Sequence, residues 1–182
     1  MNSISTPKAN PFDAPLRTPR ELFSVYAAVM DELKRRKITR TGNNPAADYA
    51  EWLVAKHLQL TLSTKSNAGH DATGAVGIRY EIKCRRLSPS NGSRQLSPFR
   101  SLTEHHFDFL VGVLFRPNFR VEKACIVPWE TVRDLATHRK HVNGHVLFLR
   151  DALWNTPNVE DITLDLQSAQ LDADDQEKTV SP

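Results

Sequence analysis

The chain has 182 residues, of which 40% are hydrophobic and 25% charged, a composition typical of one globular domain. Its two cysteines, Cys84 and Cys125, are too few for a disulfide framework, and neither has the paired spacing of a zinc site. The longest apolar run, residues 109–115, is too short to span a membrane, and residues 1–15 lack the apolar core of a secretory signal. These features argue against secreted and membrane proteins and predict an intracellular, cytoplasmic one.

The charge is distributed unevenly along the chain. The net charge is +3, but residues 155–182 carry −6, which leaves +9 on residues 1–154. A basic body is what a protein needs to attract a polyanion such as a nucleic acid. Moderate positive charge also serves solubility alone, so charge by itself leaves both interpretations open.

Two helices are predicted first. Residues 18–21, Thr-Pro-Arg-Glu, combine an N-cap, a proline at the first helical position and the glutamate of a capping box. This helix ends on the basic run 34–37, which is favourable at the negative end of the helix dipole. Asn44 and Pro45 begin a second helix that runs to about Leu58. The first helix has an apolar stripe formed by Leu22, Val25, Val29 and Leu33.

Alternating apolar residues predict a short strand at residues 58–62 and a clearer strand at residues 76–85. Between them, the polar loop 63–70 leads to Asp71. On the second strand, charged side chains share one face and apolar side chains share the other. The charged face consists of Arg79, Glu81, Lys83 and Arg85, and the apolar face of Val76, Ile78, Tyr80, Ile82 and Cys84.

The rest of the chain is predicted to alternate between loops, strands and helices. Residues 87–106, rich in serine, form a long loop that we expect to be mobile until it binds a ligand. After it come a strand buried on both faces, a second strand, a helix, a third strand and a weaker helix. These elements span residues 107–115, 121–127, 129–137, 146–149 and 159–170.

Together these elements predict an α/β fold with the core order αβββαβ, in which helices flank a mixed sheet. We expect a flexible N-terminal segment at residues 1–17 and one domain at residues 18–170. Residues 171–182 form an acidic tail with few apolar side chains, which predicts disorder.

The motif Glu-x-Lys occurs twice, and secondary structure separates the two copies. Glu32 and Lys34 lie on the first helix, where residues two apart do not share a face. Glu81 and Lys83 lie on a strand, where a period of two places both side chains on one face, roughly 7 Å apart. Only the second copy can converge on one ligand, so we regard the first as a decoy.

Asp71 precedes Glu81 by ten residues, with Gly74 and Gly77 between them, so a short hairpin can bring the two carboxylates together. Two adjacent carboxylates repel each other unless a cation lies between them. Oxygen ligands with open positions for water and phosphate suit Mg²⁺, and Mn²⁺ is a possible substitute. We expect Asp71 and Glu81 to bind the metal and Lys83 to orient the attacking water.

The competing interpretation is that Glu81 and Lys83 belong to a solvated strand face. Glu51 argues against it, because this carboxylate lies on the second helix one turn from Ala47 and Ala55, an unusual place unless it faces a buried site. We expect Glu51 to support the site from outside the ligand set or at a second metal. A group of arginines follows the strand and could hold a phosphate backbone: Arg85, Arg86, Arg94 and Arg100.

This arrangement resembles the PD-(D/E)XK nuclease superfamily, which has the restriction-endonuclease-like fold. The family pattern of a helix glutamate, an aspartate and Glu-x-Lys is matched by Glu51, Asp71, Glu81 and Lys83. The matched region is about residues 44–150, and His70 stands where the pattern has proline. The resemblance implies Mg²⁺-dependent hydrolysis of DNA. Because the chain is small and has no ATPase motif, we expect a type II restriction-like endonuclease that cuts double-stranded DNA as a homodimer.

Two other functional classes remain open. The first is a non-catalytic nucleic-acid-binding module on the same fold, and the second is a partner-binding protein whose acidic tail masks the basic body. The histidines add no zinc site, because Asn143-Gly144 between His141 and His145 predicts a turn instead of a metal-binding helix. We interpret His105 and His106 as surface residues at the end of a loop.

Overall fold

The computed structural model describes residues 14–64 and 69–179, the last three of these without their side chains. The chain divides into two units, Met1–Gly42 and Asn43–Pro182. The boundary lies inside the domain expected at residues 18–170, because the first helix belongs to the smaller unit. Within the N-terminal segment expected to be flexible, Ala14–Leu16 form a 3-10 turn and residues 1–13 lie outside the described part.

The smaller unit consists mainly of helix α1, Pro19–Arg35, and its predicted start is confirmed. The Thr18 hydroxyl accepts from the Glu21 backbone N–H at 3.3 Å, and the Glu21 carboxylate accepts from the Thr18 backbone N–H at 2.7 Å. These two bonds form the capping box. Glu32 of the decoy motif pairs with Arg35 and Arg36 on the same helix. Side chains of the predicted apolar stripe remain exposed, namely Leu22, Val25 and Val29.

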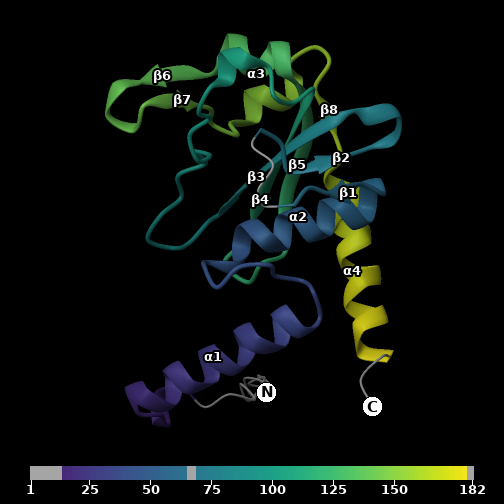
Figure 1. The fold of residues 1–182 in the computed structure, drawn as a ribbon. Helices are drawn as coiled ribbons and strands as arrows, with labels where there is room; N and C mark the ends of the chain where they lie inside the picture. The colour runs from purple at the N-terminus through teal and green to yellow at the C-terminus, as the bar shows by residue number, and fades with distance from the viewer. Residues whose placement is uncertain (1–13, 65–68, 180–182) are drawn as a thin grey trace, which may run out of the picture. The chain divides into compact units, whose positions relative to one another are not determined.

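The larger unit is built on a six-stranded mixed sheet (Figure 1). Its strand order is β1-β2-β3-β4-β5-β8, in which β3 and β4 are parallel and the other neighbours antiparallel. The mixed sheet and the α/β class predicted from the sequence are confirmed. The strands are β1 (Thr61–Leu62), β2 (Ala72–Thr73), β3 (Arg79–Arg86), β4 (Phe109–Phe115), β5 (Val121–Pro128) and β8 (Glu160–Asp161).

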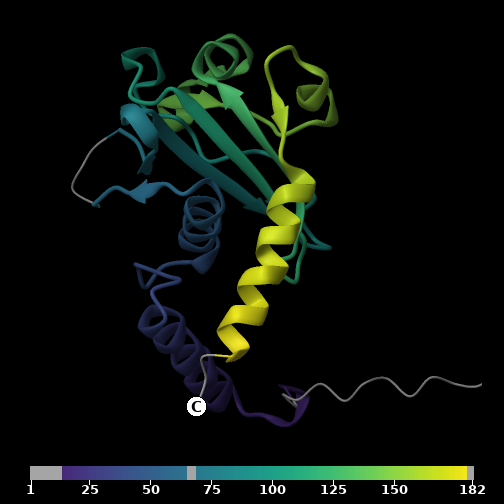
Figure 2. The ribbon, with the colours of Figure 1, turned by 90° about the vertical axis from the view of Figure 1, so that its right-hand side faces the viewer.

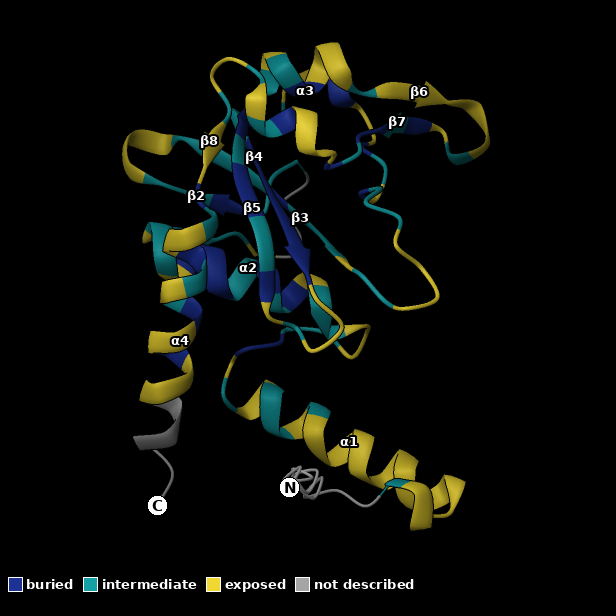
Figure 3. Ribbon diagram, turned by 180° about the vertical axis from the view of Figure 1, so that it is seen from behind, coloured by how far each residue is buried: buried dark blue, intermediate teal, exposed yellow. Residues whose placement is uncertain are grey.

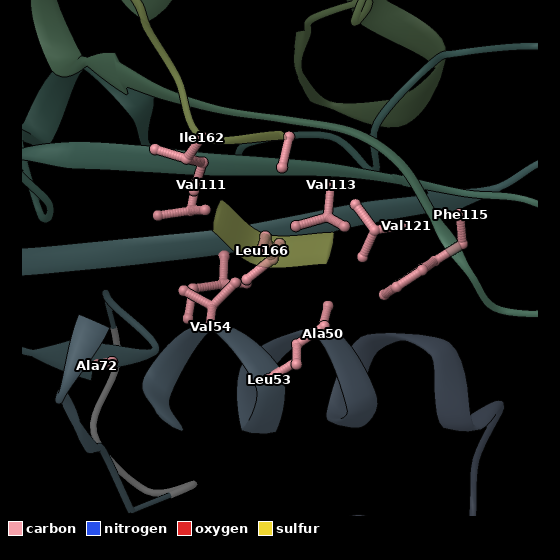
Figure 4. Close-up of a cluster of buried hydrophobic side chains, with 12 residues drawn as sticks. Ala50, Leu53, Val54, Ala72, Val111, Val113, Phe115, Val121, Ile162 and Leu166 are labelled. Carbon is pink, nitrogen blue, oxygen red and sulfur yellow. The ribbon is translucent and has the colours of Figure 1, made fainter. Parts of the chain in front are cut away.

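Helices α2 (Pro45–Leu58) and α4 (Thr163–Thr179) cover one face of this sheet (Figure 2). The predicted start of α2 is confirmed, since the Asn44 side chain accepts from the Ala46 backbone N–H at 3.0 Å. The core on this face joins the two helices to β3, β4 and β5 (Figure 4). Its fully buried side chains include Leu53, Val54, Val111, Val113, Phe115 and Leu166.

Helix α3 (Trp129–Leu135) covers the opposite face, together with the segment between β3 and β4. Strand β4 therefore has packed layers on both sides, as its continuous apolar run predicts, and Figure 3 shows it buried along its length. The second core includes Leu96, Phe99, Phe107, Leu110, Val127, Val132 and Leu149.

The order of elements differs from the expected αβββαβ core. β2 is an additional strand that the sequence pattern missed, because two residues are too few to show alternation. As predicted for the strands at 107–115 and 121–127, both β4 and β5 precede α3. The strand expected at residues 146–149 forms only in part, as β7 (Gly144–Val146), and it pairs with β6 (Thr137–Arg139) in a separate two-stranded sheet.

Two local expectations are wrong for identifiable reasons. The strand expected from Val76 begins at Arg79, because Val76 lies in the hairpin turn with φ 51° and is 96% exposed. The segment 87–106, expected to be a mobile loop, instead buries Leu96, Phe99 and Leu102 in the second core. These apolar residues stand three apart, which matches neither a strand nor a full helical pattern.

The C-terminal helix is displaced from its expected position and is longer than expected. Residues 160–161 form β8, and α4 begins at Thr163 and continues to Thr179, across most of the tail expected to be disordered. Ala173 is buried, which gives this part of the helix a packed contact. Within the described residues, none of the helices combines the length and the apolar composition that crossing a membrane requires.

Candidate active site

The hairpin between β2 and β3 holds Asp71 opposite Glu81. In this antiparallel pair Ala72 lies opposite Tyr80, so the same register places Asp71 opposite Glu81. The Asp71 backbone N–H donates to the Tyr80 carbonyl at 2.9 Å, and its Oδ2 accepts from the Ile82 backbone N–H at 2.7 Å. The Asp71 carboxylate therefore extends the strand pairing by one residue and lies beside Glu81. The ten-residue separation of Asp71 and Glu81 predicted this arrangement.

Glu81 and Lys83 share one face of β3 and form an ion pair. The Lys83 Nζ lies 2.8 Å from Glu81 Oε1, and the two side chains are only 14% and 18% exposed, respectively. The same ammonium group donates to Ser97 Oγ at 3.4 Å and lies 4.9 Å from the centre of the Phe99 ring. Lys83 is thus held between Glu81 and the segment that follows β3. The period of two along a strand correctly predicted that Glu81 and Lys83 share a face.

The electrostatics of Glu81 favour a cation at this place. Burial raises the pKa of Glu81 above its ordinary value, the Lys83 ammonium opposes this shift, and the Asp71 carboxylate adds to it. The two carboxylates are therefore close enough to repel each other, and Lys83 offsets only part of the cost of burying the charge. An added positive charge between Asp71 and Glu81 would relieve both effects.

These three residues line a cavity of about 310 Å³. Its floor comes from the β2–β3 hairpin, and its other walls come from the chain before Asp71 and from the segment between β3 and β4. The residues that line it together with Asp71, Glu81 and Lys83 are Gly69, His70, Pro98, Phe99, Arg100, Ser101, His106 and Phe107.

His106 forms part of the cavity wall, although the sequence favoured a surface role. Its Nε2 lies 2.8 Å from a carboxylate oxygen of Glu104, and its positive form would lower the pKa of Glu81. Gly69 fits tightly against the His106 side chain, because a Cβ at Gly69 would lie 2.9 Å from His106 Cβ. His70 also lines the cavity, and its position directly before Asp71 was the available sequence signal.

Glu51 does not line the cavity. It lies on α2, which packs on the face of β3 that carries Ile82 and Cys84, opposite the face of Glu81. Its negative charge contributes to the raised pKa of Cys84, about 12, of which burial is the main cause. Helix α2, which carries Glu51, therefore lies on the other face of β3 from Glu81 and Lys83, and the supporting role expected of Glu51 stays a prediction.

Three of the four arginines expected to bind DNA make contacts away from the cavity. Arg85 donates to the Ser93 carbonyl at 3.2 Å, and Arg86 donates to the Pro117 carbonyl at 3.1 Å. Arg94 donates to the Asp151 carboxylate at 2.8 Å and lies 3.9 Å from a carboxylate oxygen of Glu122. Arg100 is exposed and lines the cavity, so it is the member of the group that the fold places beside Lys83.

The donor atoms at the cavity suit Mg²⁺ or Mn²⁺, because Asp71 and Glu81 provide carboxylate oxygens and their mutual repulsion favours a divalent cation. Among the described residues, no cluster of three or more His, Cys, Asp or Glu side chains has the geometry of a metal site. A metal bound by these two carboxylates would therefore take its remaining ligands from water and from the substrate, which is common for Mg²⁺.

No protein-family model matches this chain, and no curated protein matches its sequence.

Proposed function

We propose that this chain is a Mg²⁺-dependent DNA endonuclease that hydrolyses phosphodiester bonds. The observation that carries the proposal is the convergence of Asp71, Glu81 and Lys83 on one cavity. Two carboxylates and a lysine with this spacing were expected from the resemblance to PD-(D/E)XK nucleases. The alternative of a solvated strand face fits less well, because Glu81 and Lys83 are more than four-fifths buried.

Each residue has a distinct role in the proposed reaction. Asp71 and Glu81 would hold the metal ion, which when bound polarises a phosphate and lowers the pKa of a water ligand. Lys83 orients the attacking water and offsets the negative charge that develops on the phosphate. The ring of Phe99 and the Ser97 hydroxyl hold the lysine in place, which limits its freedom before the substrate arrives.

The substrate side of the proposal depends on charge. Residues 1–154 carry +9, and Arg100 lies on the cavity wall where it can contact a phosphate. We propose double-stranded DNA as the substrate, in the manner of a type II restriction enzyme. Cutting both strands requires two catalytic sites, so we expect a homodimer, which sedimentation of the protein with and without DNA would test.

Plasmid cleavage tests the proposal directly. Supercoiled plasmid incubated with the protein and Mg²⁺ should be nicked or linearised, and a chelator should prevent this. Lys83→Ala should reduce the cleavage rate by at least a hundredfold while the far-ultraviolet circular dichroism spectrum stays unchanged. Glu32→Ala, on the decoy motif of α1, is the matched control and should cleave at the wild-type rate.

The possible outcomes separate the candidate functions. Wild-type turnover by Lys83→Ala would contradict the catalytic role of this lysine. DNA binding without cleavage in either Mg²⁺ or Mn²⁺ would instead favour the non-catalytic binding module. If neither binding nor cleavage occurs with any DNA tested, the nuclease proposal fails.

A further inference from the structure

The hairpin formed by β6 and β7 carries a concentration of positive charge. Arg139 and Lys140 are exposed at its turn, between the exposed His138 and His141. The sequence contains no acidic residue from Ala136 to Arg150. The turn forms at Asn143, which has φ 45°, as the Asn-Gly pair predicted. Figure 1 shows the hairpin extending beyond the main sheet.

The basic side chains of the hairpin differ from the arginines that the sequence singled out. Arg94 is held by the Asp151 carboxylate at 2.8 Å. Among the described residues, neither Arg139 nor Lys140 has an acidic partner. Arg139 also borders, with Arg150, a second cavity of about 340 Å³. The positive charge of the hairpin is therefore available to an external anion.

The hairpin is joined directly to the wall of the candidate active site. Phe99, which lines the catalytic cavity, exchanges two backbone hydrogen bonds with His145 of β7, at 2.8 and 2.9 Å. Gly144 permits this close approach, because a Cβ there would lie 2.9 Å from the Phe99 carbonyl oxygen. Lys83 in turn lies against the Phe99 ring. The hairpin is thus joined by backbone hydrogen bonds to Phe99, whose ring contacts Lys83.

We infer that the β6–β7 hairpin is a DNA-binding ribbon that enters the major groove beside the phosphate being cut. This inference rests on the proposed endonuclease function. A two-stranded antiparallel ribbon fits the major groove of B-DNA, which is roughly 12 Å wide. Arg139 and Lys140 at the turn are placed to contact phosphates or base edges, and the Phe99–His145 bonds keep this contact in register with the catalytic cavity.

The test is DNA binding by the full-length chain across a range of salt concentrations. Fluorescence anisotropy with a labelled DNA duplex, in Ca²⁺ without Mg²⁺, reports binding without depending on cleavage. The test variant is Arg139→Ala/Lys140→Ala. The control is Lys56→Ala/Arg120→Ala, which removes the same charge from α2 and from the β4–β5 turn, neither of which lines the catalytic cavity.

Each phosphate contact contributes about −0.9 to the slope of log affinity against log salt. The hairpin variant should therefore lose about 1.8 units of slope if both side chains contact phosphate, whereas the control should keep the wild-type slope. Protection of guanine N7 against methylation, a major-groove signal, should also be lost in the hairpin variant alone.

A hairpin variant with the wild-type slope and the wild-type N7 protection would overturn the inference and leave the endonuclease proposal standing. If the wild-type protein shows no salt-dependent binding to DNA, both the inference and the proposed function fail. The hairpin variant could show the reduced salt dependence while Lys83→Ala still cleaves plasmid at the wild-type rate. That result would support DNA binding by the hairpin and contradict the catalytic role proposed for Lys83.

Discussion

Replacement of Asp71 by asparagine and by alanine should separate the structural role of this residue from the catalytic role proposed for it. Asp71 Oδ2 accepts the Ile82 backbone N–H at 2.7 Å, and Ile82 is only 5% exposed. Asparagine can keep this hydrogen bond through its side-chain oxygen but loses the negative charge. Alanine leaves the Ile82 N–H without its side-chain acceptor in a buried strand.

The expected changes in stability follow from this contact. A buried donor that loses its acceptor costs about 1–3 kcal/mol, and a bond to a charged acceptor lies toward the upper part of that range. Asp71→Ala should therefore lower the free energy of unfolding by about 2–3 kcal/mol. Asp71→Asn should lower it by about 1 kcal/mol or less, because only the charge assistance is lost and the repulsion from Glu81 is relieved.

Urea unfolding and plasmid cleavage, measured on the same preparations, give the two readouts. Both Asp71 variants should lose cleavage in Mg²⁺, whereas only Asp71→Ala should be strongly destabilised. Asp108→Ala is the matched control for Asp71→Ala, because Asp108 Oδ2 accepts the Arg79 backbone N–H at 2.8 Å and Asp108 does not line the cavity. This control should lose stability but keep activity. Wild-type cleavage by Asp71→Asn, or wild-type stability of Asp71→Ala, would refute the double role.

Two further predictions concern the same hairpin. In metal-free buffer, wild-type stability relative to Glu81→Gln should fall as pH rises from about 4.5 through the raised pKa of Glu81, because the folded state binds that proton more tightly than the unfolded state. Urea midpoints of both proteins against pH would show this, and Mg²⁺ should stabilise the wild type more than Glu81→Gln. Val76→Asn should raise the free energy of unfolding by about 1 kcal/mol, because φ 51° strains a β-branched residue and a side chain that is 96% exposed loses no packing. An unchanged midpoint in urea would contradict that strain argument.

The residues that the sequence located correctly depend on local geometry. Glu81 and Lys83 share a face because a strand has a period of two, and Asp71 reaches Glu81 because a ten-residue separation closes into a hairpin. The helix starts at Thr18 and Asn44 were also predictable, since capping depends on residues within one turn.

The features that the sequence did not reveal come from contacts between distant parts of the chain. The position of Glu51 on a helix was predicted, but no local signal shows which face of the sheet that helix covers. Arg94, which was expected to bind DNA, pairs in the structure with Asp151, which lies 57 residues away in the sequence. A charged side chain in a polar segment looks the same whether its partner is a phosphate or a distant carboxylate.

The two sides of the cavity differ in how far the sequence predicts them. The side that carries the charged residues of the candidate site was predictable, whereas the side proposed to contact the substrate was not. The hairpin supplies the two carboxylates of the candidate site and Lys83 from a short stretch of sequence. The opposite wall, residues 98–101, belongs to the segment expected to be a mobile loop. That segment is held by backbone hydrogen bonds from Leu96 to Leu147 and between Phe99 and His145, which join segments far apart in the chain. Because these long-range bonds also position the β6–β7 hairpin, substrate recognition in the proposed enzyme depends on the part of the fold that local patterns do not specify.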